Sequence, residues 1–142
     1  MSLGRNKMNS ITLMDAYAIE NLRSYGYSND QILSKVQERD IEEFKKVKEN
    51  LDFSLLIDMD ESVGLKTLLE DGYKVKFLTF NGLKNLIKLK FGKIAEEDYR
   101  VDEFTLSGLK LDESQALDLG DVLSSNWQMI EEQDGYKVQP AK

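Results

Sequence analysis

Residues 71–82, Asp71-Gly72-Tyr73-Lys74-Val75-Lys76-Phe77-Leu78-Thr79-Phe80-Asn81-Gly82, separate two different hydrophobic patterns. Within this stretch, aromatic or β-branched side chains alternate with lysines, which is typical of a strand. Before it, apolar residues recur every three or four positions, as they do in amphipathic helices. We therefore predict a strand over 73–80 that is broken by Asn81-Gly82, with helices upstream.

Two helix starts can be read directly from the upstream sequence. Thr12 followed by Asp15, and Ser28 followed by Gln31, each place a capping side chain three residues before its partner. Gly26 lies between them, where a residue with positive φ would end the first helix. These signals predict two helices that meet at a glycine corner.

The rest of the upstream segment is also helical in pattern. Residues 12–51 predict two or three short helices, the third of them opened by an Asp40–Glu43 cap. A further helix is expected over 61–71, where Gly72 would stop it.

Downstream of residue 82, short helices and strands are expected to alternate. The fold class is therefore predicted as α+β, with an N-terminal two- or three-helix segment followed by a small, mainly antiparallel sheet with interspersed short helices. The expected elements are a helix over 83–91, a strand near 103–106, a helix capped by Asp112 and a strand over 127–130 before the Asp134-Gly135 turn.

The length of 142 residues predicts one domain. We place it at 9–133, with a helical part over 12–71 and a mixed strand and helix part over 73–133. Residues 1–8 are interpreted as a tag, and residues 134–142 as a frayed tail or a short closing strand.

The composition excludes several kinds of chemistry. The chain has no cysteine and no histidine, so thiolate nucleophiles, zinc–sulfur sites and Ser-His-Asp triads are ruled out. We assign no catalytic, cofactor-binding or metal-binding residue. No apolar run approaches the about 18 residues of a membrane span, and no signal peptide is evident, so a cytoplasmic location is expected.

Residues 19–33 form the nearest approach to a known motif. A helix, a glycine turn, a serine cap and a second helix resemble the first part of a helix-turn-helix and also the ubiquitin-associated three-helix modules. Asp30 and Glu38 cancel Lys35 and Arg39, so the second helix has no net positive charge with which to bind phosphates. A plain helical corner is the favoured interpretation.

Charge is unevenly distributed along the chain. Residues 72–95 contain six lysines and no acid, so this segment is +6, while the net charge of −7 leaves −13 for the remainder. The segment is either a contact surface for phosphate or an acidic partner, or a solvated face paired with the chain's own acids. The partner-binding candidates are Lys84, Lys88, Lys90 and Lys93.

A cluster of acids at Asp58, Asp60 and Glu61 raises the question of Mg²⁺ or Ca²⁺ binding. The EF-hand template fails here, because Val63 stands where glycine is required and Leu69 where the bidentate glutamate is required. We interpret the cluster as an acidic cap at a helix N-terminus.

The segment Phe77-Leu78-Thr79-Phe80-Asn81-Gly82-Leu83-Lys84-Asn85-Leu86, together with the acidic, lysine-rich and histidine-free composition, is similar to uncharacterised small proteins of phages and prophages of low-GC Gram-positive bacteria. The resemblance implies an accessory protein without an assigned activity. It transfers no catalytic residue to this chain.

These observations favour a non-catalytic protein-interaction module, whose partner is another protein or a second copy of the chain. One alternative is a small nucleic-acid-associated regulator that uses residues 12–38 or the basic segment. The other is a Mg²⁺-dependent hydrolase built on Asp58, Asp60 and Glu61.

Overall fold

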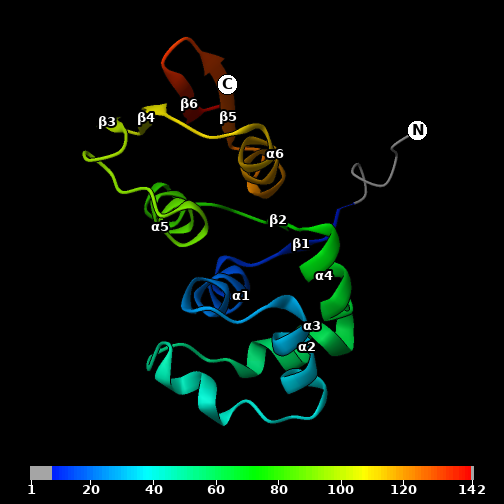
Figure 1. Cartoon of the computed structure of the whole chain (residues 1–142). Helices are drawn as coiled ribbons and strands as arrows, with labels where there is room; N and C mark the ends of the chain where they lie inside the picture. The colour runs from blue at the N-terminus through cyan, green and yellow to red at the C-terminus, as the bar shows by residue number, and fades with distance from the viewer. Residues whose placement is uncertain (1–7, 142) are drawn as a thin grey trace. The chain divides into compact units, whose positions relative to one another are not determined.

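The computed structural model describes residues 8–141 and divides the chain into two compact units, Met1–Lys74 and Val75–Lys142. The boundary falls inside the stretch 71–82, where the hydrophobic pattern changes. The fold is α+β, as predicted (Figure 1). Residues 1–7 of the expected tag lie outside the described residues.

Unit 1 is mainly helical. Both capping boxes are confirmed: Thr12 exchanges hydrogen bonds with Asp15, and Ser28 does so with Gln31. Gly26 follows the first helix with φ 124°, a conformation that disfavours other residues. The elements are β1 (Ser10–Ile11), α1 (Leu13–Tyr25), α2 (Asn29–Gln37), the 3₁₀ helix η2 (Glu42–Lys46), α3 (Ser54–Ser62) and α4 (Leu65–Asp71).

Two predictions for unit 1 are wrong in detail. The Asp40–Glu43 cap does not form, because Lys35 binds both carboxylates at 3.3 and 2.9 Å, and the following helix is a 3₁₀ turn. The helix expected over 61–71 is split into α3 and α4 by Gly64, whose φ of 100° is incompatible with a helix.

The acidic cluster also lies elsewhere than expected. Asp58, Asp60 and Glu61 occupy the second half of α3 instead of a helix N-terminus. Asp60 Oδ1 accepts a hydrogen bond from Leu65 N–H at 3.1 Å, so it caps the start of the next helix, α4. Glu61 pairs with Arg39 at 2.8 Å. Within residues 8–141 no group of three acids is arranged to hold a metal ion.

A buried polar network joins the helices of unit 1. Glu20 is 2% exposed, and its Oε2 accepts hydrogen bonds from the Tyr73 hydroxyl at 2.6 Å and from Arg23 Nη1 at 3.0 Å. Arg23 also donates to the Leu69 carbonyl at 2.8 Å and to Asn29 Oδ1 at 3.1 Å. One ion pair therefore ties α1 to α2, to α4 and to the segment before β2.

The second polar network of unit 1 raises the pKa of a tyrosine. The Tyr27 hydroxyl donates to Glu43 Oε2 at 2.6 Å, and this bond raises the pKa of Tyr27 from 10.0 to about 12. The same bond and the Lys35 ammonium lower the pKa of Glu43. Because the folded pKa of Tyr27 is raised, the bond's stabilisation is complete below pH 10 and is lost as the pH rises through about 12.

An alkaline titration followed by tyrosinate absorbance tests this linkage. We expect the Tyr27→Phe variant to lose a phase near pH 12, and the Glu43→Gln variant to shift that phase towards 10. If Tyr27→Phe instead removes a phase near pH 10, the Tyr27–Glu43 bond does not persist in solution.

Unit 2 builds a four-stranded antiparallel sheet in the order β3-β4-β6-β5, accompanied by two helices (Figure 1). Asp112 forms the predicted cap, reinforced by Gln115. The elements are α5 (Phe80–Phe91), β3 (Arg100–Asp102), β4 (Thr105–Leu109), α6 (Glu113–Val122), β5 (Trp127–Glu132) and β6 (Gly135–Pro140), and β2 (Lys74–Val75) precedes them.

The strand predicted over 73–80 is wrong beyond its first residues. Only Lys74–Val75 is a strand, and it pairs with β1. Thr79 caps α5 by accepting a hydrogen bond from Gly82 N–H at 3.0 Å, so Asn81-Gly82 lies in the first turn of a helix instead of ending a strand. The strand expected near 103–106 is a β3–β4 hairpin, whose turn contains Glu103 at φ 56°.

Leucine, isoleucine, valine and aromatic side chains fill the core of each unit. Ile19, Leu22, Ile32, Phe44 and Leu56 are fully buried in unit 1, and Leu83, Leu86, Ile87, Leu106 and Val138 in unit 2. None of the helices in the described part of the chain is long and apolar enough to cross a membrane.

Candidate interaction face

The loop between α6 and β5 binds the residue that leads into α5. Ser124 Oγ accepts a hydrogen bond from Leu78 N–H at 3.0 Å. The Leu78 carbonyl accepts two more, from Asn126 Nδ2 at 3.1 Å and from the Trp127 indole N–H at 2.6 Å. Ser124 Oγ is also hydrogen-bonded to the Asn126 side chain. This clamp fixes the start of α5 against the start of β5.

Three aromatic rings meet beside the clamp, at one end of the sheet. Phe80 is the first residue of α5, Trp127 the first of β5, and Phe104 lies in the β3–β4 turn. The Phe80 ring centroid lies 5.8 Å from that of Trp127 and 6.0 Å from that of Phe104, which it meets nearly edge-on at 84°. Both distances are favourable for aromatic pairs. Phe104 is 65% exposed, so the cluster reaches the surface.

Two of the candidate lysines extend this cluster along α5. Lys84 follows Phe80 by one helical turn, and its Nζ lies 4.9 Å from the Phe80 ring centroid in a cation–π contact. Lys88 follows Lys84 by another turn and is exposed. We call Phe80, Lys84, Lys88, Phe104 and Trp127 the aromatic–lysine face.

The structure does not bring the other two candidate lysines to this face. Lys90 Nζ contacts both carboxylate oxygens of Asp118 at 3.1 Å, and its side chain is only 4% exposed. Lys90 therefore joins α5 to α6 inside the unit. Lys93 lies beyond Gly92, whose left-handed conformation ends the helix, and it is half-buried.

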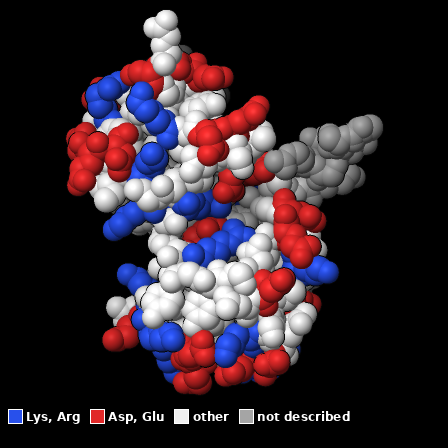
Figure 2. Space-filling view, viewed as in Figure 1, with Lys and Arg blue, Asp and Glu red and all other residues white. Residues whose placement is uncertain are grey.

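Outside the aromatic–lysine face, basic and acidic side chains are more evenly mixed on the surface than their distribution along the sequence suggests. Figure 2 shows basic and acidic side chains interspersed on the visible face of both units. In unit 1, Lys35 and Arg39 of the helical corner are already paired with Asp40, Glu43 and Glu61. These basic residues of the corner are thus engaged by the chain's own acids.

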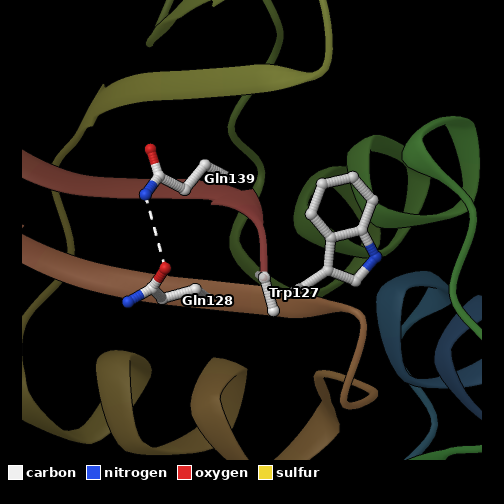
Figure 3. Close-up of a pocket in the computed structure, with 4 residues that line it drawn as sticks. Trp127, Gln128 and Gln139 are labelled. Carbon is white, nitrogen blue, oxygen red and sulfur yellow. Dashed lines mark hydrogen bonds between the residues drawn. The ribbon is translucent and has the colours of Figure 1, made fainter.

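At the same end of the sheet, β5, β6 and the following Ala141 form a shallow pocket lined by Trp127, Gln128, Gln139 and Ala141. Gln139 Nε2 donates to Gln128 Oε1 at 3.4 Å. Figure 3 shows the two amides side by side, with the indole of Trp127 pointing away from them. The indole and the amides therefore occupy opposite faces of the sheet, as strand alternation requires.

The titratable groups of unit 2 with shifted pKa values lie outside this face. Burial, reinforced by the Asp98 carboxylate, raises the pKa of Tyr99. The Arg100 guanidinium, which pairs with Asp134 at 2.9 Å, lowers the pKa of Asp134. The face itself offers rings and ammonium groups, which suit binding.

No protein-family model, curated protein or solved structure matches this chain. Sequence reasoning found Lys84 and Lys88 through the missing acids, but it did not identify Phe80, Phe104 or Trp127 as binding residues. These three aromatic residues are separated by more than 20 positions, and no local pattern links them.

Proposed function

We propose that this chain is a protein-interaction module that binds an acidic segment of a partner protein through the aromatic–lysine face. The observation that supports it most is the Phe104–Phe80–Lys84 series of contacts, in which the exposed ring of Phe104 packs against the half-buried ring that Lys84 Nζ contacts. Aromatic side chains in such positions commonly supply most of the binding energy of an interface. The sequence resemblance suggests a phage or prophage accessory protein of the host cytoplasm as its setting.

Charge favours an acidic protein segment over nucleic acid. The face contains only two lysines, and the chain as a whole has a net charge of −7. A polynucleotide would gain little from counterion release at two sites, and its many phosphates would be repelled by the remaining acids more strongly than a single acidic side chain would be. A short segment with an acid and an apolar side chain needs only one ion pair and one ring contact.

Peptide selection tests this proposal. A random displayed library is selected on the wild-type protein, and the enriched peptides are then measured against the Lys84→Glu, Lys88→Glu double variant. We expect acidic peptides whose affinity falls at least about tenfold in that variant. The matched control is Lys48→Glu with Lys66→Glu, which changes the net charge equally at exposed lysines of unit 1 and should bind normally.

Two outcomes would contradict the proposal. In the first, the enriched peptides are not acidic. In the second, both double variants bind the peptides equally well. Folding is checked separately by far-ultraviolet circular dichroism, and the spectra of both double variants should match that of the wild type.

A further inference from the structure

The four-stranded sheet of unit 2 ends at β5. In the order β3-β4-β6-β5, this strand is hydrogen-bonded within the described residues to β6 on one side only. An edge strand presents its remaining backbone N–H and C=O groups to any chain that can pair with them. Trp127 belongs both to β5 and to the aromatic–lysine face, but the pairing proposed below uses backbone groups of β5 and does not require the proposed peptide binding.

The position of Pro140 opposite Trp127 indicates which backbone groups of β5 point away from β6. Trp127 is opposite Pro140, which has no N–H, so this must be a non-hydrogen-bonded pair. The Ala141 N–H accordingly binds the Asn126 carbonyl at 2.9 Å. Hydrogen-bonded and non-hydrogen-bonded pairs alternate along an antiparallel ladder. Met129 and Glu131 are therefore also in non-hydrogen-bonded pairs with β6, and they direct their N–H and C=O groups away from it.

We propose that this chain forms a homodimer in which β5 pairs antiparallel with β5 of a second copy, about a twofold axis at Met129. In this register Met129 is opposite the partner's Met129, and Trp127 is opposite the partner's Glu131. The Met129 pair exchanges two hydrogen bonds. Trp127 N–H is already bound to the Ser124 carbonyl at 3.1 Å, so each outer pair adds one bond, from Glu131 N–H to a Trp127 carbonyl. The two sheets then form one continuous eight-stranded sheet.

The charges of β5 select this register. With the axis at Met129, the Glu131 carboxylates of the two copies lie about 14 Å apart along the strands. That separation exceeds the screening length of about 8 Å at physiological salt, so their repulsion is small. An axis at Glu131 would set two glutamates directly opposite each other, which is destabilising. An axis at Trp127 would leave most of the edge unpaired.

Proline at the axis tests the hydrogen bonding. Met129→Pro removes an N–H that points away from β6, a position at which edge strands tolerate proline. Sedimentation equilibrium should show a dimer for the wild type and a dissociation constant raised about tenfold or more by Met129→Pro. The matched control, Met129→Ala, loses the same side chain but keeps the N–H and should remain dimeric. A monomeric wild type at about 100 μM would overturn the proposal.

Cross-linking tests the register without relying on the stability of a proline variant. The chain has no cysteine, so an introduced cysteine can be oxidised only to a second copy. Across the axis, Met129→Cys places two Cα atoms about 5.5 Å apart, within disulfide range. Glu132→Cys, on the same strand, places them about 20 Å apart. Cross-linking of the Met129→Cys variant alone supports the register. Cross-linking of neither variant, or of both equally, would overturn it.

Discussion

Replacing Glu20 by alanine is expected to cost unit 1 about 3 kcal/mol of unfolding free energy. Arg23 and the Tyr73 hydroxyl would each lose a short bond to a carboxylate that is only 2% exposed. Removing one member of a buried ion pair costs more than the pair contributes, because the remaining charge stays in a poorly hydrated place. Arg23 is 27% exposed, which keeps the expected loss at the lower end of the range for such pairs.

Urea denaturation measures this loss, and Glu20→Gln is the matched control. The amide oxygen of glutamine can still accept a hydrogen bond from Tyr73, so this variant should be less destabilised than the alanine variant. If both variants lose the same free energy, or if alanine costs less than about 1 kcal/mol, the network does not hold the helices together as described.

Replacing Ser124 by alanine is expected to destabilise unit 2 by about 1–3 kcal/mol. The Leu78 N–H is buried and would lose its acceptor, the Ser124 hydroxyl, which belongs to a residue only 3% exposed. The substitution should also loosen Asn126 and thereby the Trp127 indole. Because Trp127 is the sole tryptophan, its fluorescence reports directly on the clamp, and we expect its emission to shift to longer wavelength.

The neighbouring Ser125 is exposed and provides the matched control. Ser125→Ala should change the unfolding free energy by less than about 0.5 kcal/mol and leave the emission of Trp127 unchanged. Equal stability of the two alanine variants would show that the clamp on Leu78 contributes nothing to unit 2.

The parts of the fold that the sequence predicted well are specified locally. Thr12 with Asp15, Ser28 with Gln31 and Asp112 with Gln115 each hold both halves of a capping box within four residues. A capping box can be recognised from residues that are close together in the sequence, so α1, α2 and α6 start where expected.

The errors arose where two local signals competed. Residues 73–80 alternate like a strand, yet Thr79 caps a helix, and the cap together with the clamp on Leu78 determines the structure there. The clamp comes from residues 124–127, more than 40 positions away, so the local pattern could not reveal it.

Only part of the aromatic–lysine face could be predicted, because this face also depends on contacts between residues far apart in the sequence. A run of lysines without acids marked α5, but periodicity alone could not show that Lys90 turns inward to Asp118 while Lys84 contacts Phe80. The rings of Phe80, Phe104 and Trp127 come from a helix start, a hairpin turn and a strand start. The pairing of the strands brings Phe104 and Trp127 to one end of the sheet, and the clamp on Leu78 holds Phe80 there.

Trp127 fluorescence provides the most direct measurement of the proposed binding. A selected acidic peptide is titrated into the wild type and into the Lys84→Glu, Lys88→Glu variant, and a ten-nucleotide thymidine oligomer is titrated in parallel at about 50 mM salt. We predict a saturable change with the peptide that weakens at least about tenfold in the variant, and no change with the oligonucleotide. Equal peptide affinity in the two proteins, or saturable binding of the oligonucleotide in place of the peptide, would contradict binding of an acidic protein segment at the aromatic–lysine face.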